Sequence, residues 1–384
     1  MSKKPILFVS DSISASSGLA RITRDLAVLV HQNLGDRFRV ATVGYGGAGS
    51  IKFPFPQYHL HTIDNWITPE LPAIADDFAQ GDEPIICFVW DASRLYWLGT
   101  PEKCHDSRLR YWVENAPKKL WIYGAIDAEG PNGKISHSIA QTYKGFDRVL
   151  DYTEWSTRIT GNAEHLPHGI DTSVFYPRDR RAARSSFVQH GFHGLKQDSL
   201  LVGIVATNQA RKDWQLGMEA CRILLDRGHD VRVWAHTDVM TRYWDLDELV
   251  TDYGLAGRVA ATVNRFTDDE LAELYSACDV TLGVGPEGMG YPIMESLACG
   301  VPCVTGNYAA QSEYVPKKYL ADPIAFYYEG AFCSKRPVFN ASEWADKVES
   351  AALESSQVAR ESILPESLDW NNLWPRWSEW FMEV

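Results

Sequence analysis

Two glutamates and two glycines form the most distinctive group of potentially reactive residues in the chain. Glu287 and Glu295 have seven residues between them, and Gly288 and Gly290 lie just before a segment predicted to be helical, Tyr291–Cys299. Glycines leave backbone N–H groups uncovered at a helix start, where the helix dipole favours a phosphate. Carboxylates accept hydrogen bonds from hydroxyls. The pattern predicts a site for a polyhydroxylated ligand carrying a diphosphate; the alternative is a capped helix with an acidic first turn.

A pair of cations follows a predicted strand in the same half of the chain. Arg211 and Lys212 come shortly after the apolar run Leu200–Ala206. Fixed cations at the end of a strand suit the oxygens of a diphosphate. The alternative is a pair of solvated charges at the start of a helix.

The first half of the chain offers a glycine-bearing loop and ionisable residues at strand ends. In the loop Ser10–Arg21, Gly18 would let the backbone approach a ligand closely. Asp91 and Asp127 follow predicted strands, from which they would face a ligand, although each also suits the cap of a loop. His168 lies in a loop, where packing explains it as well as catalysis does.

Short apolar runs alternate with amphipathic segments, which is the pattern of strand–helix–strand units around parallel sheets. The predicted strands are Pro5–Ser10, Phe38–Val43, Pro84–Val89, Lys119–Tyr123, Arg148–Tyr152, Leu200–Ala206, Val231–Ala235, Val280–Val284 and Pro302–Thr305. The predicted helices are Gly18–Leu34, Trp214–Arg227, Asp268–Ala277 and Tyr291–Cys299. This order predicts two doubly wound α/β domains, whose ligands bind beyond the carboxyl ends of the strands.

Length and composition are those of an ordinary two-domain globular protein, with 384 residues, 45% hydrophobic and 23% charged. No stretch approaches the ~20 apolar residues of a membrane span. The apolar run after Lys4 is too short for a signal peptide and predicts a buried strand. The seven scattered cysteines show neither a disulfide framework nor a zinc site. We therefore expect a cytoplasmic location.

The net charge of −13 argues against binding nucleic acid over a large surface. A local basic groove remains an alternative. Its candidate cations are Arg21, Arg24, Lys118, Lys119, Arg178, Arg180, Arg181 and Arg184. We favour a solvated helix face or linker for the arginines, because the segment between Asp171 and about Gln197 is polar and basic.

The motifs resemble those of glycosyltransferase family 4, whose members are retaining enzymes of the GT-B fold. Glu287 and Glu295 match the family's two glutamates in spacing, with Met289 where phenylalanine is usual. Three further blocks resemble the family: Pro167–Pro177, Asp269–Asp279 and Ala298–Val304. The resemblance implies two Rossmann-like domains facing each other across a cleft. Residues 1–175 would be the acceptor-side domain, 176–367 the nucleotide-sugar donor domain, and 368–384 a helix crossing back onto the first.

The resemblance also implies roles for particular residues. Glu287 would contact the hydroxyls of the donor sugar, Glu295 would bind the ribose, and Lys212 matches the family's lysine. Thr207 occupies the position of the family's arginine, so Arg211 would have to substitute for it.

Further expected positions surround the two substrates. Asp91 takes the place of a residue that touches the transferred sugar, and the loop with Gly18 resembles the family's glycine-rich loop near the donor phosphates. Gly288, Met289 and Gly290 would also contact the donor, and Asp127, Arg21 and His168 would lie on the acceptor side. The donor would be a UDP- or GDP-sugar, with no other cofactor and no metal. Retention could proceed by attack on the same face, with an oxygen of the diphosphate taking the acceptor proton and no protein nucleophile.

The acceptor expected for the family is a saccharide or small molecule. The opening segment 11–21 also resembles family members encoded by bacterial viruses, some of which glycosylate modified DNA bases. Such an activity would place the protein in the host cytoplasm with hydroxymethylated DNA as acceptor. The motifs would also suit an epimerase or hydrolase acting on nucleotide sugars, or a non-catalytic protein that binds them.

Three segments imitate other functions. Gly44–Gly49 matches a dinucleotide-binding fingerprint, but the prolines at 54 and 56 prevent the helix that it must open. Asp245 and Asp247 imitate a metal-binding acid pair but lie in a helix-like stretch, so no metal site is predicted. The aromatic tail 368–381 lacks the basic face of a membrane-surface helix and is predicted to belong to a core.

Overall fold

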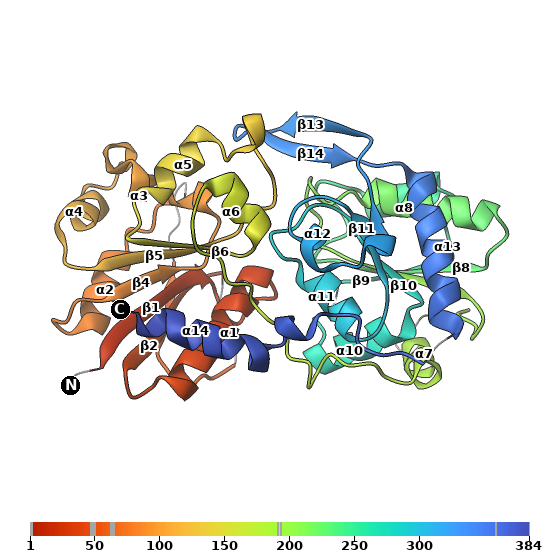
Figure 1. Ribbon diagram of the computed structural model, residues 1–384, viewed down its shortest axis with the longest axis horizontal. Coiled ribbons are helices and arrows are strands. Elements are labelled where there is room, and N and C mark those ends of the chain that lie inside the picture. Colours follow the sequence, from red (N-terminus) through yellow and green to blue (C-terminus); the bar gives the residue numbers. More distant parts are fainter. Residues whose placement is uncertain are drawn as a thin grey trace. The chain divides into compact units, whose positions relative to one another are not determined.

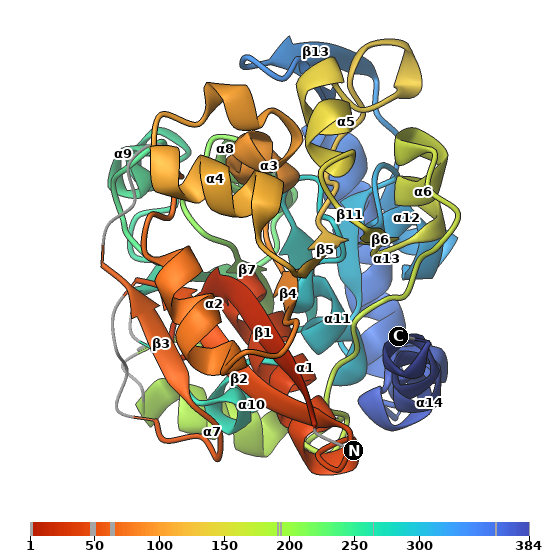
Figure 2. The same ribbon diagram turned by 90° about the vertical axis from the view of Figure 1, so that its left-hand side faces the viewer.

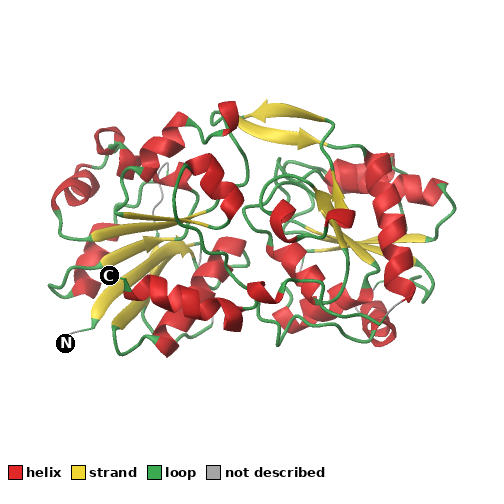
Figure 3. Cartoon of the chain, viewed as in Figure 1, coloured by secondary structure: helices red, strands yellow, loops and turns green. Residues whose placement is uncertain are grey.

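Apolar runs near the N-terminus build a six-stranded parallel sheet with strand order β3-β2-β1-β4-β5-β6. Its strands are β1 (Lys4–Asp11), β2 (Phe38–Tyr45), β3 (Gln57–Leu60), β4 (Ile85–Phe88), β5 (Lys119–Gly124) and β6 (Arg148–Asp151). The central strand β1 is buried from Pro5 to Ser10, because helices cover both faces of a doubly wound sheet (Figure 3). The helices of this part are α1 (Gly18–Asn33), α2 (Leu71–Ala79), α3 (Tyr96–Gly99), α4 (Ser107–Asn115), α5 (His137–Tyr143) and α6 (Glu154–Thr160), with 3₁₀ turns η1 (Ala92–Leu95), η2 (Pro101–Lys103) and η3 (Pro131–Gly133).

A second six-stranded parallel sheet has the order β12-β11-β10-β7-β8-β9. Its strands are β7 (Leu200–Val205), β8 (Val231–His236), β9 (Val259–Thr262), β10 (Val280–Gly283), β11 (Cys303–Gly306) and β12 (Leu320–Ala321), and a separate hairpin comprises β13 (Ala325–Glu329) and β14 (Ser334–Val338). The remaining helices are α7 (Arg180–Gln189), α8 (Trp214–Asp226), α9 (Leu246–Asp252), α10 (Asp268–Ala277), α11 (Tyr291–Ala298), α12 (Gln311–Tyr314), α13 (Ala341–Gln357) and α14 (Trp370–Met382), with 3₁₀ turns η4 (Lys317–Tyr319) and η5 (Glu366–Leu368).

The computed structural model describes residues 3–46, 51–61, 66–189, 192, 194–263, 265–357 and 359–383. The chain divides into two compact units (Figure 1). Unit 1 comprises residues 1–168, 330–334 and 373–384, and unit 2 comprises residues 169–329 and 335–372. Among the described residues, no helix is long and apolar enough to cross a membrane.

The aromatic tail forms most of helix α14 and packs in unit 1. The rings of Trp380 and Trp121 lie 4.8 Å apart, and Phe381 lies 6.2 Å from Phe8 on β1. Trp377 donates a hydrogen bond from Nε1 to the carbonyl of Pro167 at 3.0 Å. These aromatics are therefore core residues, as predicted.

The predicted linker after Asp171 is wrong in part, because it contains helix α7. Arg184 of α7 is only 1% exposed and is not the solvated charge expected of it. It lies 2.5 Å from Asp279, at the start of β10, and it also donates to the carbonyls of Ala277, Lys196, Gln197 and Ser199. A buried guanidinium is tolerated only when its donors are satisfied in this way. Arg184 takes a buried position of this helix that an apolar residue usually fills. The helix therefore lacks the full set of apolar residues at helical spacing by which a helix is predicted from sequence.

Replacing Arg184 with Met should destabilise the protein strongly. The change removes one of the cations that face the carboxylate of Asp279, 8% exposed, and strips the donors from four carbonyls. We expect a loss of about 3 kcal/mol in the free energy of unfolding by urea denaturation. Arg181→Met, on the same helix at an exposed position, should change it by less than about 0.5 kcal/mol. Equal effects of the two substitutions would contradict this role.

Candidate functional site

The loop between β10 and α11 owes its shape to two glycines. Gly285 has φ +110° and Gly290 has φ +91°, values that side-chain-bearing residues rarely adopt. A Cβ on Gly285 would lie 2.4 Å from the carbonyl oxygen of Arg211. Glycine therefore allows this loop to approach the backbone of the segment that follows β7.

Three consecutive backbone N–H groups, which lead into the N-cap of α11, have no acceptor among the described residues. Gly290 is the N-cap and provides no side-chain cap, and the N–H groups of Ile293 and Met294 bond to its carbonyl. Among the described residues, none accepts a hydrogen bond from the N–H of Gly288, Met289 or Gly290. Donors of this kind at a helix N-terminus attract an anion.

Glu287 lies between the two predicted cations. Lys212 forms an ion pair with Glu287 through Nζ and Oε1. Arg211 donates from Nη1 to the carbonyl of Pro286 at 2.9 Å and lies 3.5 Å from Glu287 Oε2. The Lys212 side chain is 5% exposed, whereas those of Glu287 and Arg211 are 17% and 24% exposed. The three side chains together carry a charge of +1, which favours an anionic ligand.

Helix α12 holds the loop through residues that the sequence analysis did not identify. The Gln311 amide accepts from the N–H of Glu287 at 3.1 Å and donates to the carbonyl of Gly285 at 3.2 Å. Tyr314 donates from its hydroxyl to the carbonyl of Met289, and the N–H of Ala310 donates to the carbonyl of Glu287 at 3.2 Å. No motif marks Gln311 or Tyr314, because only the tertiary fold brings α12 to this loop.

Glu295 is further along α11 and is 4% exposed. It accepts a hydrogen bond from the hydroxyl of Tyr275, on α10, at 2.7 Å. Burial, with the Glu295 carboxylate next, raises the pKa of Tyr275 well above its usual value, so the phenol stays a hydrogen-bond donor. Tyr275 fixes the orientation of the carboxylate that was predicted to bind ribose.

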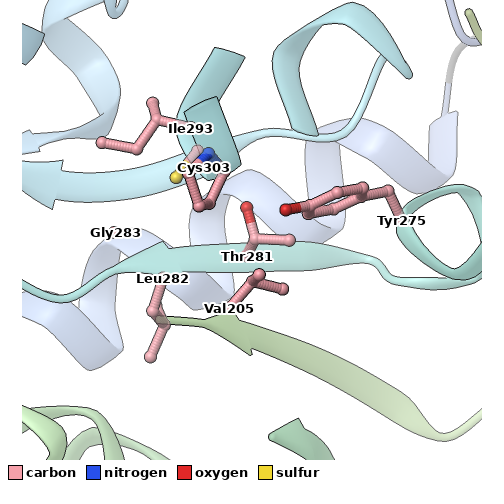
Figure 4. A pocket seen from close by; sticks show the side chains of 8 residues that line it. Val205, Tyr275, Thr281, Leu282, Gly283, Ile293 and Cys303 are labelled. Carbon is pink, nitrogen blue, oxygen red and sulfur yellow. The ribbon is translucent and has the colours of Figure 1, made fainter. Parts of the chain in front are cut away.

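A small cavity beside Tyr275 is too small for a nucleotide. Figure 4 shows the hydroxyls of Tyr275 and Thr281 directed toward this space, which Ile293 and Cys303 also line. Its volume is ≈ 10 Å³, enough for about one water molecule.

The candidates in unit 1 are distributed around the carboxyl ends of its strands. Gly18 is the first residue of α1, capped by Ser17, which accepts from the N–H of Ala20 at 3.1 Å. Asp91 follows β4 and lies 3.2 Å from Arg94. Asp127 follows β5 and is half-buried.

His168 is a buried residue of unit 1, 1% exposed. Its Nδ1 lies 3.3 Å from the hydroxyl of Tyr123, and its ring lies 4.9 Å from that of Tyr152. Burial, with the charge of Arg21 second, lowers the pKa of His168 to about 3. The imidazole is therefore neutral near neutral pH and packs among aromatic rings.

Two of the segments that resemble motifs of other functions remain to be placed. Asp245 has a structural role, and part of Gly44–Gly49 lies outside the described residues. Asp245 accepts from the N–H of Glu248 at 3.2 Å as the N-cap of α9, which places the Asp245–Asp247 pair in a helical stretch as expected. Residues 47–49 of the Gly44–Gly49 segment lie outside the described residues. Within the described part of the chain, no group of three or more His, Cys, Asp or Glu residues could hold a metal ion.

The family model and the curated relative that match this sequence both describe glycosyltransferases. Residues 198–349 match the family model of the group 1 glycosyl transferases. The D-inositol 3-phosphate glycosyltransferase of Mycobacteroides abscessus is 32% identical over 143 residues, which cover 35% of this chain and 29% of that relative. The chain thus aligns with less than a third of the curated relative.

Solved structures show a similar fold over nearly the whole chain. Sucrose-phosphate synthase from Thermosynechococcus elongatus has a TM-score of 0.67 at 15% identity, covering 99% of both chains. Anabaena Alr3699/HepE, solved in complex with UDP and glucose, has a TM-score of 0.70 at 15% identity, covering 99% of this chain and 100% of the other. At such identity the similarity establishes the fold.

Replacing Gln311 with Leu should loosen the loop without unfolding the sheet. The change removes two hydrogen bonds, each worth about 1 kcal/mol, so the amide proton of Glu287, which bonds to Gln311, should exchange about 30-fold faster. Thr305→Val is a matched control, because Thr305 donates one buried bond to the carbonyl of Gly283, just before the loop. Exchange that is equally fast in both variants would show that Gln311 does not hold the loop.

Replacing His168 with Gln should make the protein less sensitive to acid. The unfolded imidazole binds a proton below about pH 6.5, whereas the folded one does so only near its pKa of about 3, so stability falls with pH through this window. From about pH 8 to pH 5 this loss is about 2 kcal/mol, and the variant should be spared it in urea denaturation. Asp151, whose pKa burial raises to about 6, acts in the opposite direction in both proteins and cancels in the comparison. His61→Gln, at an exposed site, should keep the full loss; an unchanged loss in His168→Gln would refute the assignment.

Proposed function

We propose that this chain, which has the GT-B fold and matches the family model of the group 1 glycosyl transferases over residues 198–349, is a retaining glycosyltransferase using a UDP- or GDP-sugar. The observation that carries the proposal is the Lys212–Glu287 pair in a loop where the N–H groups of Gly288, Met289 and Gly290 have no acceptor among the described residues. Anabaena Alr3699/HepE was solved with UDP-glucose and with UDP, which favours UDP as the nucleotide. Residues 176–367 would form the donor domain and 1–175 the acceptor-side domain.

The donor diphosphate would bind at the start of α11. The N–H groups of Gly288, Met289 and Gly290 would donate to its oxygens, and Lys212 and Arg211 would balance its charge. The carboxylate of Glu287 would then accept hydrogen bonds from the sugar hydroxyls. Glu295, oriented by Tyr275, would bind the ribose.

The chemistry places growing negative charge on the leaving diphosphate. The bond between the anomeric carbon and the diphosphate oxygen breaks as the acceptor oxygen attacks on the same face. The acceptor proton passes to the leaving diphosphate, so no protein nucleophile and no metal or other cofactor is needed. Fixed cations and helix-start donors stabilise this charge without reorganising, which is the usual source of the largest catalytic effect.

Unit 1 would supply the remaining contacts. Gly18 would lie near the donor phosphates and Asp91 against the transferred sugar, and Asp127 and Arg21 would lie on the acceptor side. His168 would act there as a positioning residue, because its low pKa keeps it neutral. The acceptor would be a saccharide or small molecule in the cytoplasm. Modified DNA is less favoured, because Arg178, Arg180 and Arg184 are paired with Asp269 and Asp279.

Transfer from a panel of radiolabelled UDP- and GDP-sugars to saccharides and to hydroxymethylated DNA tests the proposal. Lys212→Met should lower kcat/KM at least about 10²-fold, because it removes the cation that balances the leaving group. Glu287→Gln should abolish most transfer while nucleotide binding, measured by calorimetry, persists. Arg222→Gln, an exposed arginine of unit 2, should leave both unchanged. Full transfer by Glu287→Gln would refute the role of Glu287, and a product of inverted anomeric configuration by NMR would refute retention.

A further inference from the structure

The hairpin of β13 and β14 carries exposed aromatic side chains on consecutive residues. Phe326, Tyr327 and Tyr328 of β13 are 43%, 49% and 59% exposed. Single apolar residues on a surface need no explanation, whereas a contiguous group of them marks an interaction site. A two-stranded hairpin is also only marginally stable by itself, and further strands stabilise it. The hairpin is therefore a candidate for pairing with another strand.

Alternation along the hairpin decides which backbone groups face outward. The N–H of Ile324 donates to the carbonyl of Val338 at 2.8 Å. Because successive residues of an antiparallel strand direct their N–H and C=O groups to opposite sides, the groups of Ala325, Tyr327 and Glu329 point away from β14. Outside the hairpin, no described residue bonds to the backbone of these three. Strand β13 also contains neither proline nor lysine, with which natural proteins often protect a sheet edge.

The opposite edge of the hairpin, formed by β14, is closed to another strand. By the same alternation, the backbone groups of Lys335 and Pro337 point away from β13. The carbonyl of Lys335 accepts from the hydroxyl of Tyr308 at 2.9 Å, and Pro337 has no N–H to donate. Figure 1 shows β14 on the side of the hairpin toward the other elements of unit 2, and Figure 2 shows β13 above them. Of the two edges, that of β13 is therefore the open one.

The open edge is complementary to itself. Antiparallel pairing of two copies about Tyr327 places this tyrosine opposite its own counterpart, and Phe326 then faces Tyr328. Aromatic pairs directly opposite each other across two strands are favourable. Ala325 faces Glu329, so no two carboxylates meet. The outward N–H and C=O groups of facing residues then bond to each other.

Local charge favours this pairing, although the whole chain has a net charge of −13. Glu329 lies 2.7 Å from Nε of Arg336, which balances its charge. With Lys335 the charged side chains of the hairpin sum to only +1, so two hairpins repel each other little. The aromatic residues of β13 offer roughly 300 Å² of side-chain surface in each copy. This is less than the ~800 Å² per partner of a stable interface, so the expected complex is weak.

We propose that residues 325–329 pair antiparallel with the same strand of a second copy of this chain, giving a weak dimer. The two hairpins form one four-stranded sheet. Because both copies use the same residues, the contact is isologous and closes at two chains. Aromatic residues placed symmetrically about a central tyrosine match themselves in antiparallel pairing, which favours a second copy over an unrelated strand.

Sedimentation velocity of the full chain, from micromolar to near-millimolar concentration, tests this pairing. The unmodified chain should shift from monomer to dimer as its concentration rises. Tyr327→Lys and Tyr327→Glu should each weaken the dimer at least about tenfold, because each replaces an aromatic pair with like charges directly opposite each other. An equimolar mixture of the two variants should associate again, because opposite charges then face each other. A hairpin that had lost its fold could not be rescued in this way.

Hydrogen exchange gives a second readout of the same pairing. The amides of Ala325, Tyr327 and Glu329 should exchange more slowly at high concentration, whereas those of Phe326 and Tyr328, which point to β14, should not change. Tyr111→Lys, at a 67% exposed tyrosine of unit 1, is the matched control and should dimerise as the unmodified chain does.

Three results would overturn the proposal: a chain that stays monomeric throughout this range, a dimer that Tyr327→Lys leaves intact, or a mixture of the two variants that fails to associate. A monomer that instead sediments with phosphatidylcholine vesicles, and no longer does so in Tyr327→Lys, would show that the aromatic edge binds lipid. That result would overturn the proposal as well.

Discussion

The candidate site around Glu287 depends on the close approach of two backbones, those of Gly285 and Arg211. Any side chain at 285 would place its Cβ 2.4 Å from the carbonyl of Arg211, so the two loops could not meet. Their contact brings Lys212, which follows β7, to Glu287, which follows β10. These strands are neighbours in the sheet although nearly 80 residues separate them in the chain. The ion pair is therefore a consequence of strand order, and glycine is the local condition for it.

Burial of Lys212 costs desolvation free energy, which neighbouring groups offset. A lysine side chain with 5% exposure loses most of its hydration, and a single nearby carboxylate offsets part of that loss. Buried ion pairs of this kind seldom add to stability, so stability does not explain why this one lies at the end of a sheet. An arrangement that holds a cation ready for an anion does explain it. Gln311 and Tyr314 bond the backbone of the same loop, whose N–H groups at Gly288, Met289 and Gly290 have no acceptor in the described part of the chain.

Apolar runs and glycines in the sequence were sufficient to predict the buried strands and the loop before α11. The buried central strands are continuous apolar runs, and they were located within two residues, as at β7 and β10. The glycine-bearing loop before α11 was recognised for a similar reason, since its glycines mark where the backbone turns.

Strands β3 and β9 were missed because they lie at sheet edges and are only partly buried, as in Gln57–Leu60. Helix α7 was missed because an arginine, Arg184, occupies a core position of its buried face. Contacts across long stretches of sequence were beyond such patterns: Arg94 and Trp66 carry no motif, and their stacking becomes visible only when β4 is laid beside β1.

The two sheets share one architecture, but the charged side chains that follow their strands differ. Both are six-stranded and parallel, and in both the candidate residues follow the carboxyl ends of the sheet's first strand and of one of its neighbours. Around β7 and β10 the charged side chains Arg211, Lys212 and Glu287 sum to +1, and the helix start adds N–H donors. Around β1 and β4 the charged side chains Asp11, Asp91 and Arg94 sum to −1, beside aromatic rings. Because charge acts over about 10 Å at moderate salt, the first set can attract an anion although the whole chain has a net charge of −13. The two sets therefore differ by two units of charge, from +1 to −1, although the two sheets share one architecture.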